Sequence, residues 1–274
     1  MAALSEVLRA SAPAKLNLFL HITGRRADGY HTLQTLFQRI DLQDQISAQL
    51  RSDARITRTG GLAGLPAEQD LVVRAARALQ KETGCSLGAD LHIDKQIPAG
   101  AGLGGGSSDA ATTLLLLNRL WQLDLSVAEL QTIGLNLGAD VPFFLGQFDA
   151  WAEGIGERLQ PVRLPPATFV VLFPAVHCAS ARLFAEDDLQ RNCPAISFAD
   201  FNAGARTCNV FETVALRLFP ELQAAADWLN AQAGVARMTG SGSAWFARTE
   251  SYARTQQIAQ SCPKPWQAWA VRSL

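Results

Sequence analysis

Hydrophobic and polar residues follow two different periods along this chain. Residues 14–22 alternate with a period of two, which predicts a β-strand. One side of that strand carries Leu16, Leu18, Leu20 and Ile22, and the other carries Lys15, Asn17, Phe19 and His21. We expect the leucine side to face a core and Lys15 to lie beside Asn17 on the opposite side. Residues 32–50 and 91–97 are expected to form further strands.

A helical pattern follows in three places of the N-terminal half. Residues 71–83 are expected to form a helix that Asp70 caps and Gly84 ends. Residues 107–121 are largely apolar and predict a buried helix directly after a glycine-rich loop. Ser126 and Glu129 have the spacing of a capping box, so another helix is expected to begin there and to end by Gly138. The strand expected at 91–97 separates the first two of these helices, which indicates mixed secondary structure.

The C-terminal half also mixes strands and helices. Strands are expected at 168–173, near 235–239, near 244–248 and near 266–272, and helices around 209–219, 220–233 and 251–260. Glycines and prolines at 153–165 indicate a boundary, so we expect two domains, residues 1–155 and 156–274. The absence of a strict strand–helix–strand rhythm predicts an α+β fold in both.

Composition narrows the class of protein. The 274 residues carry a net charge of −1, which argues against a nucleic-acid partner. No apolar run approaches the roughly 20 residues that span a membrane, so no membrane partner is expected. Five cysteines without a C-x-x-C pair indicate reduced thiols and a cytoplasmic protein.

The stretch PAGAGLGGGSSDA, which begins at Pro98, contains five glycines and two serines between an expected strand and an expected helix. It lacks the lysine of a Walker P-loop. It matches G-x-G-x-x-G formally, but no acidic residue ends a strand about 20 residues later. Protein-kinase motifs are absent from the sequence. Glycine amides and two hydroxyls at a helix N-terminus favour an anion, and we expect a phosphate there rather than a ligand-free turn.

Three further features have competing interpretations. Asp140, beside the apolar run Val-Pro-Phe-Phe, is either a structural carboxylate or a base with a tuned pKa. Lys15 is either a solvated charge at a strand edge or a functional cation. The glycine turn from Thr239 to Ser243 is either a plain hairpin turn or a second loop close to phosphates.

Four segments together resemble the GHMP small-molecule kinases. They are PAKLNLFLHITGRRADGYHTLQTLFQ at 13–38, the glycine loop, LGADVPFFL at 137–145 and MTGSGSAWFA at 238–247. The first segment is similar to the branch that phosphorylates the 2-hydroxyl of 4-diphosphocytidyl-2-C-methyl-D-erythritol in non-mevalonate isoprenoid synthesis. The resemblance implies an N-terminal domain like ribosomal protein S5 domain 2 and a ferredoxin-like C-terminal domain. Another GHMP kinase and a catalytically inactive nucleotide-binding regulator are the alternatives.

The resemblance also implies roles for individual residues. Lys15 and Asp140 would be catalytic, and ATP with Mg²⁺ would be the cofactors. ATP would be bound by Lys95, Pro98, Ala99, Gly100, Ala101, Gly102, Leu103, Gly104, Gly105, Gly106, Ser107 and Ser108. The cytidine-diphosphate-linked substrate would be bound by Asn17, Tyr30, His31, Phe184, Gly240, Ser241 and Gly242. Asp70 departs from the asparagine that the family commonly has there, which puts its role in adenine binding in doubt.

Overall fold

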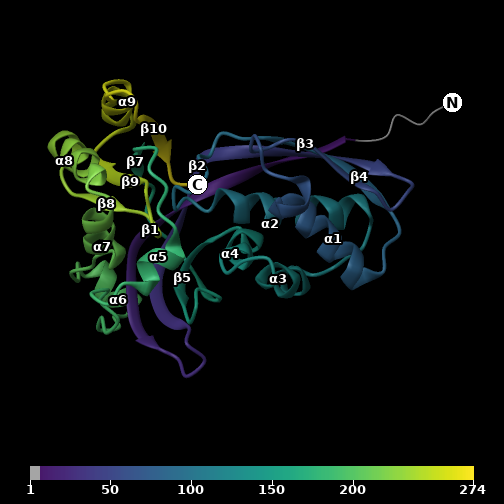
Figure 1. The fold of residues 1–274 in the computed structure, drawn as a ribbon, viewed down its shortest axis with the longest axis horizontal. Helices are drawn as coiled ribbons and strands as arrows, with labels where there is room; N and C mark the ends of the chain where they lie inside the picture. The colour runs from purple at the N-terminus through teal and green to yellow at the C-terminus, as the bar shows by residue number, and fades with distance from the viewer. Residues whose placement is uncertain (1–6) are drawn as a thin grey trace. The chain divides into compact units, whose positions relative to one another are not determined.

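The computed structural model describes residues 7–274, which fold into two compact units. Among the described residues, the first unit contains 7–14, 43–99 and 104–147, and the second contains 15–42, 100–103 and 148–274. Two long strands, β1 (Val7–Arg25) and β2 (His31–Arg51), therefore contribute to both units (Figure 1). The glycine loop is also shared, since its residues 100–103 belong to the second unit. The expected boundary near residue 155 remains a proposal.

The first unit packs helices against a small mixed sheet. Strand β4 (Gly88–Asp94) runs antiparallel to the end of β2 and parallel to β3 (Ile56–Gly60). Figure 1 shows α1 and α2 along one side of these strands. The remaining elements of this unit are the short 3₁₀ turn η1 (Ala67–Gln69) and the helices α1 (Leu71–Thr83), α2 (Gly105–Leu120), α3 (Val127–Leu135) and α4 (Val141–Gly146).

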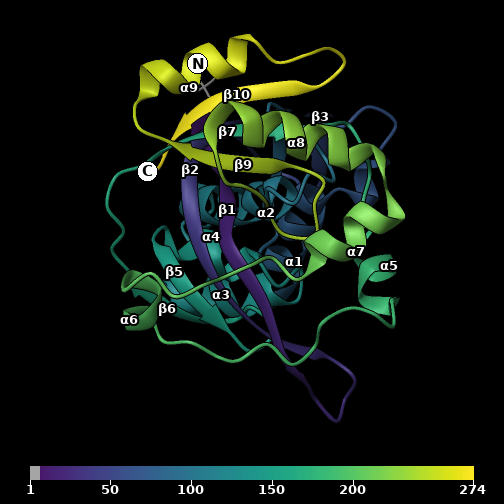
Figure 2. The same cartoon turned by 90° about the vertical axis from the view of Figure 1, so that its left-hand side faces the viewer.

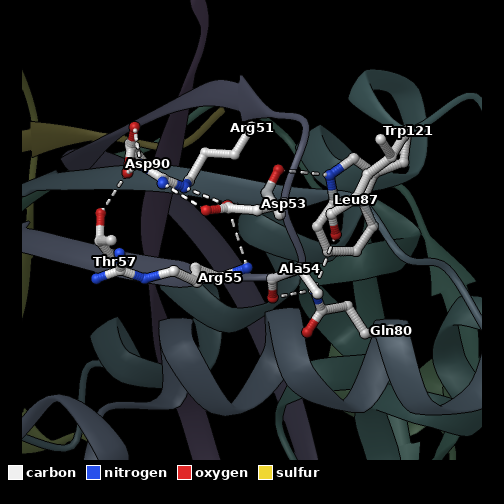
Figure 3. A network of polar contacts seen from close by, with 10 residues as sticks. Arg51, Asp53, Ala54, Arg55, Thr57, Gln80, Leu87, Asp90 and Trp121 are labelled. Carbon is white, nitrogen blue, oxygen red and sulfur yellow. Dashed lines mark hydrogen bonds and ion pairs between the residues drawn. The ribbon is translucent and has the colours of Figure 1, made fainter.

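A polar network joins the ends of these strands to α1 (Figure 3). The guanidinium of Arg51 bonds to Asp53 at 2.7 Å and to Asp90 at 3.0 Å. The Gln80 amide donates to the carbonyls of Ala54 and Leu87. The network satisfies backbone carbonyls in the turns that hold β3 and β4 in register.

The second unit contains an antiparallel sheet in the order β10-β7-β9-β8 (Figure 2). With α8 after β7 and α9 after β9, the chain order gives the β-α-β-β-α-β pattern of a ferredoxin-like domain. Strands β5 (Asp149–Glu153) and β6 (Arg158–Val162) extend the pairing of β2. The other elements are β7 (Thr168–Phe173), α5 (Ser180–Ala185), α6 (Phe198–Asn202), α7 (Phe211–Leu218), α8 (Glu221–Ala233), β8 (Ala236–Met238), β9 (Trp245–Thr249), α9 (Tyr252–Gln260) and β10 (Gln267–Arg272).

Most expected elements are confirmed, including the cap that Asp70 gives α1 and the capping box of α3. The α+β fold class is confirmed as well. Helix α2 begins at residue 105, two residues earlier than predicted. Strands β3, β5 and β6 and helices α4, α5 and α6 were not predicted, because each is short and their patterns are too brief to show a period. No helix within residues 7–274 is long and apolar enough to cross a membrane.

The expectation of a single core-facing side for β1 is wrong. Phe19, on the side expected to be polar, is fully buried, with its ring 5.2 Å from that of Trp151 and 5.7 Å from that of Phe201. Lys15 and Asn17 are also buried, with 3% and 2% of their surfaces exposed. A buried lysine must have polar partners, so Lys15 is not a solvated edge charge.

Candidate active site

The buried ammonium of Lys15 is the first feature of the site in the second unit. Its Nζ donates to Asn17 Oδ1 and lies 5.3 Å from the centre of the Phe37 ring. Asn17 is fixed in turn by Thr35, whose hydroxyl accepts from the amide at 2.9 Å, and by its own N–H, which donates to Thr239 at 2.9 Å. Asn17 and the Phe37 ring are therefore two of the neighbours of this buried ammonium.

The tip of the glycine-rich loop and the second glycine turn meet beside this lysine. The Lys15 N–H donates to the Leu103 carbonyl at 3.0 Å. Gly102 has a φ of +75°, and a Cβ added there would lie 2.1 Å from the Thr239 carbonyl oxygen. A Cβ on Gly240 would lie 3.0 Å from the Gly102 carbonyl oxygen and 3.4 Å from Lys15 Nζ. Both glycines thus allow the backbones of the loop and the turn to approach closely.

Asn209 holds the second glycine turn by hydrogen bonds to its backbone, and no motif in the sequence indicated this role. Its buried side-chain amide donates to the carbonyls of Met238 and Gly240, each at 2.8 Å. Its Oδ1 accepts from the N–H of Phe211 at the start of α7. A single asparagine in a loop has no spacing signature, because its partners lie about 30 residues away in the chain.

The remainder of the phosphate loop opens helix α2 in the first unit. Gly104 takes a left-handed conformation, with φ +74°, and the helix begins at the next residue. The N–H groups of the first helical turn have no partners within the helix and carry its positive dipole end. Ser108 is fully buried, and its hydroxyl has no hydrogen-bond partner among the residues described. This helix start can bind an anion.

Lys95 lies between two carboxylates just before the loop. Its Nζ is 2.5 Å from Asp44 and 2.7 Å from Asp109. Asp44 also accepts from the N–H groups of Gln96 at 2.6 Å and Ile97 at 2.8 Å, so one carboxylate fixes both the lysine and the entry to the loop. Burial opposes the charge of Lys95, but the two carboxylates outweigh it and raise the pKa of Lys95.

We expect Asp109 to make the stability of this unit depend on pH. Burial raises the pKa of Asp109 to about 7, although Lys95 opposes the shift. The native state then binds more protons than the unfolded chain between the unfolded value of 3.8 and about 7. Stability must therefore fall as pH rises through this window, by at most about 1.4 kcal/mol per pH unit for one proton. We expect Asp109→Asn to flatten that slope in urea unfolding curves measured at several pH values.

The matched control is Asp94→Asn, which alters an exposed carboxylate next to Lys95. We expect Asp94→Asn to keep the slope of stability against pH that the wild-type protein has. An Asp109→Asn protein that keeps the wild-type slope would show that another group binds the proton.

Asp140 stands at the start of α4, in the same unit as the helical part of the loop. The apolar residues after it are buried, so they anchor the turn that carries the carboxylate. Gly138 lies against the loop, since a Cβ on it would be 3.7 Å from the Ser107 hydroxyl. The segment expected to supply a base therefore lies beside the start of α2.

Asp70 has two structural partners. Its Oδ1 accepts from the N–H of Val72 at 2.9 Å, and its Oδ2 pairs with Arg58 at 2.6 Å. The carboxylate is nearly buried by this arrangement. Its capping role is confirmed, and the ion pair with Arg58 was not foreseen.

The residues expected to recognise a cytosine ring are partly brought together in the second unit. His31 stacks on Phe184, with ring centres 5.0 Å apart and planes 19° from parallel. Tyr30 is 62% exposed in the turn before β2. The sequence reasoning missed Arg191, whose Nε donates to His31 Nε2 at 3.1 Å. Ser241 bonds to Ser180 at 2.6 Å, which ties the second glycine turn to α5.

Comparisons with known proteins identify the family of this chain. Residues 70–147 match the GHMP kinases N terminal domain, and residues 186–268 match the GHMP kinases C terminal domain. The chain belongs to the GHMP kinases, which are small-molecule kinases that use ATP. This establishes the class of enzyme and confirms the expected two-domain GHMP kinase fold.

Full-length relatives identify the branch of the GHMP kinases to which the chain belongs. A protein of Aromatoleum aromaticum named 4-diphosphocytidyl-2-C-methyl-D-erythritol kinase is 51% identical, over 100% of this chain and 95% of its own length. One of Ralstonia nicotianae with the same name is 50% identical, over 98% and 95%. A crystal structure of 4-(cytidine 5'-diphospho)-2C-methyl-D-erythritol kinase is 34% identical, with a TM-score of 0.85 and coverage of 97% and 99%. Within the GHMP kinases, the chain belongs to the 4-diphosphocytidyl-2-C-methyl-D-erythritol kinase family.

Proposed function

We propose that this chain transfers the γ-phosphoryl group of ATP to the 2-hydroxyl of 4-diphosphocytidyl-2-C-methyl-D-erythritol. One observation carries the phosphoryl transfer: Lys15, the loop glycine Gly102 and the turn at Thr239 form one hydrogen-bonded junction. A cation and two glycine turns at one place suit a polyphosphate and a reacting hydroxyl. The names of the full-length relatives support this particular alcohol.

In the proposed mechanism, Asp140 accepts the proton of the attacking hydroxyl. Lys15 stabilises the negative charge that develops on the oxygen and on the transferred phosphoryl group. Phosphoryl transfer depends mainly on positioning and charge stabilisation, so the proton acceptor is one contributor among several. Burial strengthens the effect of Lys15, because little water screens its charge.

The phosphates of ATP are proposed to bind residues 98–108, with the α2 dipole and the loop amides as donors. Lys95, which Asp44 and Asp109 hold in place, is proposed to contribute to ATP binding as well. Mg²⁺ would neutralise phosphate charge and arrive with the nucleotide. No group of three or more histidine, cysteine or acidic residues within residues 7–274 suits a metal ion, so we propose that phosphate oxygens supply most of its ligands.

The alcohol is proposed to be held at both ends. Tyr30, His31 and Phe184 would contact its cytosine ring, and the stack of His31 on Phe184 supplies an aromatic surface for it. Asn17 would orient the polyol, since it is fixed beside Lys15. The amides of Gly240, Ser241 and Gly242 would approach the diphosphate.

The direct test supplies purified protein with ATP, Mg²⁺ and one alcohol at a time. We expect ADP release with 4-diphosphocytidyl-2-C-methyl-D-erythritol, and none above background with homoserine, mevalonate or galactose. Turnover of one of these instead would show that the choice of alcohol is wrong. ATP binding without turnover of any alcohol would indicate a regulator in place of an enzyme.

A further inference from the structure

All three nitrogens of the Arg191 guanidinium donate hydrogen bonds, either to the segment that carries Phe184 or to one imidazole. Its Nη2 donates to the carbonyls of Phe184 at 2.9 Å and Glu186 at 2.7 Å. Its Nη1 donates to the carbonyl of Leu189 at 3.1 Å. Its Nε donates to His31 Nε2 at 3.1 Å. The arginine therefore joins two residues that lie more than 150 positions apart in the chain.

The hydrogen bond to His31 determines which ring nitrogen carries a proton. A guanidinium has donors and no acceptor, so His31 Nε2 must accept. A neutral imidazole that accepts at Nε2 carries its proton at Nδ1. Burial and the charges of Arg191 and Arg25 lower the pKa of His31, which favours the neutral ring.

The remaining donor of His31 is Nδ1–H, and it favours a ligand that presents a hydrogen-bond acceptor. Nδ1–H has no acceptor among residues 7–274, so it is free to bind a ligand. Its ring is already fixed by the stack on Phe184, whose carbonyl the same arginine holds. A rigid donor beside an aromatic surface selects a ring that presents an acceptor at its edge.

We propose that Arg191 is a positioning residue that fixes His31 as an Nδ1–H donor and thereby makes the site select cytosine over uracil. Cytosine N3 is an acceptor, whereas uracil N3 carries a hydrogen. A donor aimed at that atom pairs with cytosine and leaves two donors opposed with uracil, which costs binding free energy. This inference rests on the proposed function, because it takes the ring beside His31 to be the nucleobase of the alcohol substrate.

The first experiment reads the tautomer without turnover. Protein labelled with ¹⁵N-histidine is examined by long-range ¹H–¹⁵N correlation spectra, with His31→Gln identifying the His31 signals. We expect the wild-type ring to be protonated at Nδ1, and Arg191→Met to shift it toward the Nε2–H form that predominates in water. A wild-type ring protonated at Nε2 would overturn the proposal.

The second experiment compares kcat/KM for the cytidine-linked alcohol and its uridine analogue. We expect Arg191→Met to reduce the preference for cytidine at least about tenfold, mainly through KM, and Arg191→Lys to restore little of it. An unchanged preference in folded Arg191→Met protein would also overturn the proposal. If Arg191→Met does not fold, Arg191→Lys gives the same comparison, because one ammonium cannot make all four bonds.

Arg217→Met is the matched control. Arg217 bonds to Glu186 and Asp188 of the same segment, at 2.7 Å and 2.8 Å, but does not bond to His31. We expect it to keep both the tautomer and the cytidine preference. Failure of the proposed function is distinguishable: wild-type protein would then turn over neither alcohol, whereas the tautomer experiment would still report on Arg191.

Discussion

Lys15→Met is expected to lower kcat by about 10²–10³-fold while the fold persists. Methionine nearly fills the volume of lysine and removes only the charge, so the apolar contacts along β1 survive. The cation that is lost is buried beside Asn17, with only 3% of the residue exposed, so water cannot replace it. The measurement is single-turnover phosphoryl transfer at saturating ATP, with circular dichroism and a thermal melt to confirm the native structure.

Two comparisons sharpen this prediction. Lys81→Met removes an exposed lysine on α1 and is expected to keep wild-type turnover. Asp140→Asn by itself is also expected to lower kcat. The double variant with Lys15→Met should lose less than the product of the single losses if both residues serve the proposed proton transfer. Fully additive losses would contradict that shared role, and wild-type turnover in Lys15→Met would remove Lys15 from the mechanism.

Gly102→Ala is expected to abolish activity and to destabilise the protein by about 3 kcal/mol or more. Its φ of +75° disfavours any side chain, and the new Cβ would lie 2.1 Å from the carbonyl oxygen of Thr239. The backbone on one side of the junction must then move, and this displaces the turn that holds Asn17 beside Lys15. Urea unfolding and ATP turnover measure the two effects.

Gly204→Ala is the control that separates the cost of the close contact from the cost of the left-handed backbone conformation. Gly204 has a φ of +87°, but a Cβ there would have no atom within 4 Å. We expect a cost of about 1–2 kcal/mol from the left-handed conformation alone, with activity retained. Equal losses in the two variants would mean that the contact between the glycine loop and the second turn is unimportant.

Local sequence was sufficient for many elements of the fold. Helix α1 could be predicted with both of its ends, because Asp70 and Gly84 act within a few residues of the backbone groups they satisfy. The glycine loop could be predicted as an anion site for the same reason, since its amides and its helix are contiguous. The resemblance of four segments then supplied the family, which the full-length relatives bear out.

Contacts between distant residues could not be predicted from any local pattern. Lys15 has the alternation of a surface residue but is buried, and the Asn17 that accepts from it is held by Thr239, which lies 222 residues after Asn17 in the chain. Asn209 and Arg191 have no motif, because each acts through carbonyls or a ring that only folding brings within reach.

The sequence by itself determined the class of fold, the glycine-rich loop that begins a helix and the kind of enzyme, because these depend on contiguous residues and ordered motifs. Only the tertiary structure decided that Lys15 is a buried cation, that Lys95 is shared between Asp44 and Asp109, and that Arg191 fixes the proton of His31. The physical reason is that charge, burial and tautomer are properties of a side chain's surroundings, and those surroundings come from residues far apart in the chain.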